Sequence, residues 1–232
     1  VWQSLKVTSL YAFTSVPLHI IVGMGLAMLL NADIKGLRWC RTAFYLPSVL
    51  SGVAVALLWR WLFSGEFGLI NAILDNIGID GPSWLGDPNW ALRSLVLMSL
   101  WGVGAGAIIY LAGLQGIPTD LYEAAQVDGA QFWSRFWHVT IPLMTPVLFF
   151  QLVTGIIAAL QVFTQAFIMT NGGPNNATLT QVLYLYRKGF QDFQFGYASA
   201  LAWALFLVIL VFTVLVVRSS EGWVHYEGEI KK

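Results

Sequence analysis

The sequence predicts an all-α, polytopic membrane protein with five transmembrane helices. Of its 232 residues, 57% are hydrophobic and only 10% are charged. A soluble domain carries roughly 25% charged residues, so this chain has too little charge to cover a solvated surface. The apolar residues also gather in five long stretches rather than in alternating ten-residue segments. This arrangement favours membrane-spanning helices over a β-barrel.

The composition excludes several other classes of protein. Twelve basic and twelve acidic residues give a formal net charge of zero, so the chain lacks the positive charge of a nucleic-acid-binding domain. Its high hydrophobic content excludes a disordered chain. A single cysteine, Cys40, cannot form an internal disulfide. The sequence therefore predicts one transmembrane domain over residues 1–232, without nucleic acid as a partner.

The five predicted spans are each long enough to cross a bilayer core, which takes about 20 residues of helix. The fourth is longer than this, so we expect it to tilt or to begin at the membrane surface. In chain order the predicted spans are 7–30, 42–63, 92–114, 140–169 and 197–217.

The charges of the connecting loops predict the orientation. Lys35, Arg38 and Arg41 lie between the first two predicted spans, whereas the next loop carries four acidic residues and no basic one. Because basic loops remain in the cytoplasm, the first of these loops is expected to be cytoplasmic. Alternation along the chain then gives cytoplasmic segments at 31–41, 115–138 and 218–232, and outer loops at 64–90 and 171–196.

Motifs that would carry chemistry within this chain are missing. There is no P-loop for a nucleotide, no His-Glu-x-x-His zinc motif and no Gly-x-Ser-x-Gly elbow. The predicted spans contain no carboxylate, which an ion-driven carrier would need. We therefore predict no catalytic residue, no metal site and no cofactor in this chain. If the protein moves a solute, its energy comes from another subunit.

The cytoplasmic segment 115–138 contains a predicted short helix. Pro118 suits its start, and Asp120 followed by Glu123 is typical of a capping box. Gly129 is placed to end the helix in a left-handed conformation. Taken alone, this pattern describes a helix on the membrane surface that joins two spans.

A longer set of residues at fixed spacing runs from this segment into the fourth predicted span. It comprises Glu123-Ala124-Ala125, Asp128-Gly129-Ala130, Phe136, Ile141-Pro142 and Pro146. The set resembles the EAA loop of binding-protein-dependent ABC importer permeases. With Phe44-Tyr45-Leu46-Pro47 and the outer-loop stretch 170–174, the resemblance covers essentially the whole chain and is to the maltose- and glycerol-phosphate-type carbohydrate permeases.

This resemblance implies a type I ABC importer permease fold. Such proteins usually have six core spans, so a further span is expected before Val1. In this family the EAA helix docks into a cleft of a separate ATPase subunit. ATP binding closes the ATPase dimer and drives two permease subunits from the inward-facing to the outward-facing state. The residues implied in this coupling are Glu123, Ala124, Ala125, Asp128 and Gly129.

The resemblance also implies the partners and the location. The expected partners are a second permease subunit, in a heterodimer, an ATPase dimer, an extracytoplasmic solute-binding protein and the lipid bilayer. ATP and magnesium are expected to bind the ATPase rather than this chain. The membrane is expected to be the cell membrane of a bacterium or an archaeon.

The fourth predicted span carries a stripe of residues at intervals of three and four, which are therefore expected on one helical face: Gln151, Thr154, Ala158, Gln161 and Gln165. Thr164 adds a further polar group towards the outer end. The neutral amides and hydroxyls of these residues suit the hydroxyl groups of a sugar. The alternative is that they hydrogen-bond to neighbouring helices. The candidate pathway residues are Gln151, Thr154, Gln161, Thr164 and Gln165.

Other single features have simpler interpretations. Phe163 and Phe167 are candidates for stacking on a sugar, and His19 is expected to be a hydrogen-bonded interior residue. The small residues of 101–107 predict close helix packing. Arg60, near the outer end of its span, is expected to extend towards the membrane surface, and no cationic pocket is expected within the spans.

The outer-loop residues Asn171, Gly172, Gly173 and Pro174 predict a turn from their chemistry alone. The resemblance implies that they contact the solute-binding protein.

The sequence therefore predicts the permease subunit of an ATP-driven importer, for a mono-, di- or oligosaccharide, and not an enzyme. A sugar phosphate or a polyamine is the alternative solute. From other classes, a membrane-embedded enzyme and a passive channel remain open.

Overall fold

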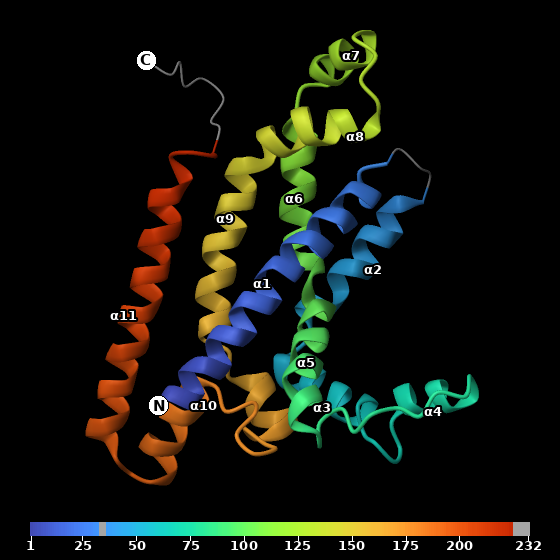
Figure 1. The fold of residues 1–232 in the computed structure, drawn as a ribbon. Coiled ribbons are helices and arrows are strands. Elements are labelled where there is room, and N and C mark those ends of the chain that lie inside the picture. Colours follow the sequence, from blue (N-terminus) through green and yellow to red (C-terminus); the bar gives the residue numbers. More distant parts are fainter. Residues whose placement is uncertain (33–35, 225–232) are drawn as a thin grey trace.

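The computed structural model describes residues 1–32 and 36–224, and in this part all regular secondary structure is helical, without a strand (Figure 1). The predicted all-α fold is confirmed. The elements in chain order are α1 (Trp2–Leu30), α2 (Leu37–Val49), α3 (Gly52–Leu62), α4 (Leu69–Asn76), α5 (Pro88–Ser99), η1 (Leu100–Gly102), α6 (Gly104–Gly116), α7 (Thr119–Val127), α8 (Phe132–Arg135), η2 (Phe136–Thr140), α9 (Ile141–Leu160), η3 (Ala166–Thr170), α10 (Gln181–Tyr186), η4 (Arg187–Gln191) and α11 (Phe195–Ser220).

The five predicted spans are present, but only some of them are continuous helices. By length and composition, three helices of the described chain could each cross a membrane: Trp2–Leu30, Phe132–Leu160 and Phe195–Ser220. Two bent pairs of helices bring the number to five if each pair counts as one span. The chain is a multi-pass membrane protein.

The second predicted span, 42–63, is not one helix. α2 and α3 meet at an angle of 97°. Leu50 and Ser51 between them have extended backbones, with ψ of 148° and 129°. Pro47 lies just before them and cannot donate a backbone hydrogen bond to the preceding turn, which weakens the helix at this point.

The third predicted span, 92–114, is also bent, by 50°, between Pro88–Gly102 and Gly104–Gly116. The bend lies in the stretch of small residues, and that stretch packs closely as predicted. A β-carbon at Gly104 would overlap the backbone carbonyl of Phe44 in α2. A β-carbon at Gly23 would lie 2.9 Å from the Tyr110 ring, so α1 and α6 also approach closely.

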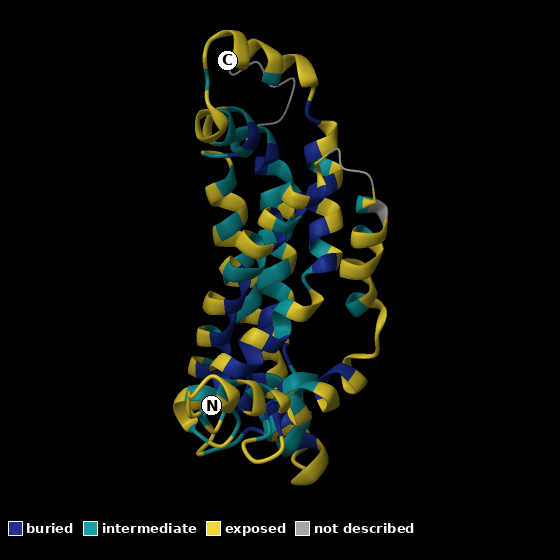
Figure 2. Cartoon of the chain, turned by 90° about the vertical axis from the view of Figure 1, so that its right-hand side faces the viewer, coloured by how far each residue is buried: buried dark blue, intermediate teal, exposed yellow. Residues whose placement is uncertain are grey.

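The helices pack around α1, which lies against α6 and α9 (Figure 1). One cluster of buried residues, which includes Tyr11 and Leu95, fills the end of the bundle near the N-terminus. A second, which includes Met24 and Met144, fills the other end. Figure 2 shows the buried residues where helices face one another and exposed residues on the outward faces. These outward faces are apolar, as expected for helices in lipid.

The loops separate into two groups at opposite ends of the molecule (Figure 1). α7, α8 and the C-terminal end of α11 lie at one end, and α4 and α10 lie at the other. This is the alternation that the charge pattern predicts. Of the basic residues used for that prediction, Lys35 and the side chain of Arg38 lie outside the described residues. The Nη2 group of Arg41 donates to the carbonyl of Leu30 at 2.8 Å and so caps the end of α1.

Candidate functional site

α7 is the helix predicted in the cytoplasmic segment, and its C-terminal end forms as expected. Gly129 has a φ of +79°. The amide of Ala130 donates to the carbonyl of Ala125 at 2.9 Å, and the amide of Gly129 to that of Gln126 at 3.0 Å. This pair of bonds is a Schellman motif, which requires a left-handed residue at the position of Gly129.

The predicted capping box at the N-terminal end of α7 is wrong. Pro118 occupies the N-cap position, and no side chain caps the helix. Asp120 therefore lies in the first turn, two positions beyond the N-cap, and cannot serve as the first member of a box with Glu123. Its carboxylate still lies where it favours the positive end of the helix dipole.

α7 is attached to the protein on one face only. The hydroxyl of Tyr122 lies 3.0 Å from Oγ1 of Thr140, and the Tyr122 ring packs against the second core cluster. Among the described residues nothing covers the opposite face, on which Val127 is 88% exposed. Of the predicted coupling residues, Ala125 is half-buried and the others are exposed: Glu123, Ala124, Asp128 and Gly129.

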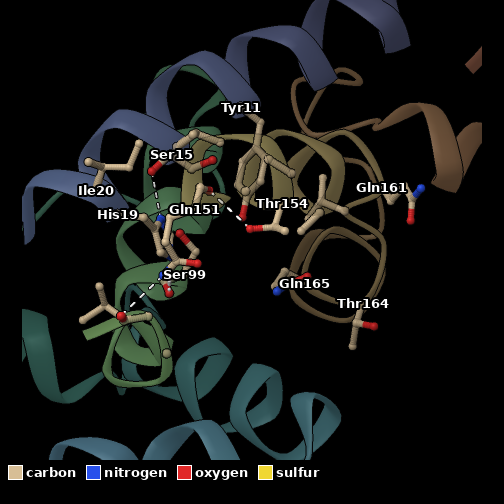
Figure 3. A pocket seen from close by; sticks show the side chains of 18 of the residues that line it. Tyr11, Ser15, His19, Ile20, Ser99, Gln151, Thr154, Gln161, Thr164 and Gln165 are labelled. Carbon is tan, nitrogen blue, oxygen red and sulfur yellow. Dashed lines mark hydrogen bonds between the residues drawn. The ribbon is translucent and has the colours of Figure 1, made fainter. Parts of the chain in front are cut away.

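A cavity of about 560 Å³ opens between α1, the bend of α5 and α6, and the end of α9 (Figure 3). All five candidate pathway residues line it, together with residues of α1 and η1. The cavity therefore brings the predicted polar residues together, although not in the way that the spacing suggested.

The prediction of one continuous helical face through the fourth span is wrong beyond α9. α9 ends at Leu160 rather than at 169, and residues 161–163 form a turn before the chain becomes helical again. The hydroxyl of Thr180, which is fully buried, donates to the carbonyl of Val162 at 2.9 Å. This bond satisfies a backbone group that the break leaves open. Thr164 and Gln165 therefore reach the cavity from a separate segment.

The polar side chains of the cavity differ in how far they are engaged. Nε2 of Gln151 donates to the carbonyl of Gly106 at 3.4 Å, as the alternative of interhelical bonding predicts. Oγ1 of Thr154 donates within its own helix, to the Phe150 carbonyl at 2.8 Å. Within the described part of the chain, no hydrogen bond occupies the side chains of Gln161, Thr164 and Gln165. Their donors and acceptors remain available to a solute.

The cavity also contains polar residues that we did not predict as pathway residues. Tyr11, Ser15 and His19 follow one another at four-residue spacing along α1, and Ser99 faces them from the bend (Figure 3). The ring nitrogens of His19 lie 2.8 Å and 3.0 Å from the carbonyl oxygens of Ser15 and Ser99. His19 is therefore hydrogen-bonded, as expected. In the sequence, this face of α1 is marked by polar residues at every fourth position of an otherwise apolar span.

The two phenylalanines near the break stack on each other. The rings of Phe163 and Phe167 are 5.3 Å apart and inclined by 11°. Phe163 lines the cavity.

No group of three or more His, Cys, Asp or Glu residues able to hold a metal ion occurs in residues 1–32 and 36–224.

The outer-loop turn predicted at 171–174 is present. Asn171 and Gly172 have φ of +45° and +77°, and the hydroxyl of Thr178 donates to the carbonyl of Gly173 at 2.7 Å. Asn171 is exposed, Gly172 is buried, and Gly173 and Pro174 are half-buried. The exposed tip of this loop continues into Asn175 and Asn176, which were not among the candidate residues.

Comparison with known proteins gives relatives over nearly the whole chain. The probable ABC transporter permease protein YesP of Bacillus subtilis is 45% identical over 98% of this chain and 75% of its own length. The trehalose/maltose transport system permease protein MalF of Thermococcus litoralis is 35% identical over 94% of this chain and 74% of its own.

Solved structures also match this fold over nearly the whole chain. A bacterial ABC transporter that imports the acidic polysaccharide alginate matches with a TM-score of 0.86 and 28% identity, over 94% of this chain and 78% of that chain. The alginate transporter in complex with a pentasaccharide-bound periplasmic protein matches with a TM-score of 0.82 and 27% identity, over 95% and 76%.

Residues 11–221 match the family described as binding-protein-dependent transport system inner membrane component. The matched residues include the cavity, α7 and the outer-loop turn. The chain belongs to this family, and it is a transport component rather than an enzyme.

Proposed function

We propose that this chain is the permease subunit of an ATP-driven importer that takes up a sugar. It accepts the sugar from an extracytoplasmic binding protein and is coupled to a separate ATPase through α7. ATP and magnesium bind the ATPase. The assembly lies in the cell membrane of a bacterium or an archaeon, with α7 on the cytoplasmic side.

The observation that carries this proposal is α7. It is a nine-residue helix at the end of the bundle, with one face fixed by Tyr122 and its other face open. Glu123 and Asp128 give this open face negative charge, and the small side chain of Ala124 permits close approach. A passive channel would have no use for such a helix. A cleft in an ATPase subunit accounts for its shape, its charge and its place in the family.

A sugar is supported by the chemistry of the cavity. None of its described lining residues is Lys, Arg, Asp or Glu, so amides and hydroxyls supply most of the polar groups that face the solute. A polyamine would need carboxylates here, and none of the described lining residues supplies one. The relatives support the same class, since MalF belongs to a trehalose/maltose transport system and the structural match is to an alginate importer.

A second permease subunit completes the pathway. Thr154, Ala158 and Gln161 line the cavity and are exposed in the single chain, so the cavity is not closed on this side. Polar side chains facing lipid are unfavourable. A partner permease against this opening, in a heterodimer, would enclose the sugar between two walls.

The test is affinity purification of this subunit from its native membrane, with identification of the bound proteins by mass spectrometry. We expect a P-loop ATPase and a second permease to co-purify. The ATPase should be lost when Gly129 is changed to Asp, and should remain in the control variant Gly116→Asp, which adds the same charge at the end of α6 where a β-carbon meets no neighbour. Recovery of the subunit alone, or of the ATPase with both variants, would contradict the coupling role of α7.

A further inference from the structure

A second pocket, of about 480 Å³, lies between α3 and η3. Val53, Leu57 and Arg60 line it from α3, and Phe167 and Thr170 line it from η3, with Asn171 just beyond. Among the described residues that line this pocket, Arg60 is the only charged one. The sequence placed Arg60 at the membrane surface and predicted no cationic pocket in the spans. The structure leaves Arg60 exposed and also places it on the wall of this concave site.

This pocket adjoins the transport cavity along one continuous segment. Phe163 lines the cavity and Phe167 lines the pocket, and their rings stack at 5.3 Å. α3 runs beside the same segment: a β-carbon at Gly52 would lie 4.0 Å from Cγ2 of Thr164, a cavity residue. Eight residues later on α3, Arg60 reaches η3 near the outer loop. The pocket therefore lies beside the cavity, on the side towards the outer loop.

The charge of Arg60 is not neutralised within the described chain. Its Nη1 group donates to the carbonyl of Ile168 at 3.3 Å. The only ion pair among the described residues is Lys188–Asp192, so no carboxylate balances Arg60. A second guanidinium, that of Arg187, donates to the carbonyl of Asn171. Two cations thus approach the segment 168–171 and contact only neutral oxygens there.

A guanidinium presents five N–H donors in a plane and stays protonated at all physiological pH values. Its one protein contact leaves the other donors of Arg60 for a ligand. This geometry matches a carboxylate or another anionic oxygen group, which accepts two parallel hydrogen bonds. The apolar side chains of Val53 and Leu57, with the part of Phe167 that lines the pocket, provide a surface for the non-polar part of a sugar ring.

We propose that this pocket is an entry subsite that binds the carboxylate of an acidic saccharide and makes such saccharides the substrates of the importer. The inference rests on the proposed function and narrows its substrate class. Arg60 holds the acidic group near the outer loop, and the amides and hydroxyls of the adjoining cavity contact the sugar hydroxyls. The phosphate of a lipid headgroup also carries anionic oxygens. The experiment must therefore distinguish an acidic saccharide from a lipid as the ligand of Arg60.

The experiment uses cells of the native host that produce the complete transporter. They are offered a mixture of di- to pentasaccharides from alginate and polygalacturonate, which are acidic, and from starch and galactomannan, which are neutral. Saccharides that accumulate in the cells are identified by mass spectrometry. A saccharide counts as a substrate of this transporter if its uptake is lost in the Gly129→Asp variant. The test variants are Arg60→Gln and Arg60→Lys. The control is Arg93→Gln, which removes an exposed arginine that lies over the Trp90 ring.

We expect transporter-dependent uptake of acidic saccharides, a loss of about tenfold or more in Arg60→Gln, partial recovery in Arg60→Lys and no change in Arg93→Gln. If only neutral saccharides depend on the transporter, the inference is overturned and the proposed function stands. If no saccharide depends on it, the proposed function itself fails. An equal loss of acidic and neutral uptake in Arg60→Gln would assign Arg60 to lipid phosphate or to the fold, and would overturn the subsite.

Discussion

α7 and the wall of the transport cavity are built in opposite ways. α7 is a single short helix whose ends are set by its own residues and whose outer face is open. The cavity wall is assembled from segments far apart in the chain, and several of them are interrupted: α9 ends at Leu160, and α5 and α6 are separated by η1. The two long helices α1 and α11 have no such break.

This difference follows from what each region does. Irregular backbone within a membrane is tolerated only where it is buried in protein or lines a cavity, because its polar groups then find partners. The break after Leu160 meets this condition through Thr180. α7 lies outside the spans and needs no such support. We therefore expect changes in the cavity wall to affect folding, and changes in α7 to affect coupling while the fold survives.

The largest expected effect is that of Gly104→Val. A side chain here would meet the Phe44 backbone, which cannot move aside as a flexible side chain could. We expect a loss of about 3 kcal/mol in the free energy of unfolding, with little folded protein recovered. The control is Gly102→Val in the same bend, where a β-carbon meets nothing within 4 Å. Thermal unfolding in detergent compares the two, and equal midpoints would show that the close approach of α2 and α6 does not support the fold.

The next effect is that of Thr180→Val, which removes the donor to the Val162 carbonyl and the side-chain cap of α10. A buried carbonyl left without a partner costs roughly 1–3 kcal/mol. We expect a lower unfolding midpoint and a cavity that binds sugar less well, both restored by Thr180→Ser, which keeps the hydroxyl. A wild-type midpoint for the valine variant would mean that the turn at 161–163 is stable without this bond.

The same contrast explains how much the sequence could predict. Pro118 and Gly129 act within their own turn of chain, so the helix between them was predictable. The polar residues of the fourth span were found by their spacing, but their continuous face was not real. No proline or glycine marks residues 161–163, and the partner of Val162 lies 18 residues away. Tertiary contacts of this kind, like those that place Arg60 in a pocket, leave no local pattern.

A smaller effect on stability is expected for Gly129→Val, because a β-branched residue with a φ of +79° costs about 1–2 kcal/mol and the strain is confined to one exposed turn. Uptake should nevertheless be lost, since the turn fixes the direction of α7. Gly129→Asn is the matched control, because asparagine tolerates the left-handed conformation and the site is open. If both variants carry sugar at the wild-type rate, the conformation of this turn does not contribute to coupling.

The smallest effect is that of Tyr122→Phe. It removes the one side-chain hydrogen bond that joins α7 to η2, between the Tyr122 hydroxyl and Thr140, and keeps the ring that packs on the core cluster. We expect a loss of about 1 kcal/mol in the free energy of unfolding, which is the usual net contribution of such a bond. Because this bond holds α7 at a fixed angle to the span, ATP hydrolysis by the assembled complex should respond less strongly to sugar, while the unfolding midpoint falls by only about 2–4 °C. Tyr122→Leu also removes the ring packing, so it should lower both the response of ATP hydrolysis to sugar and the unfolding midpoint further. A wild-type response to sugar in Tyr122→Phe would mean that packing alone, without the hydrogen bond, transmits the motion of α7 to the cavity.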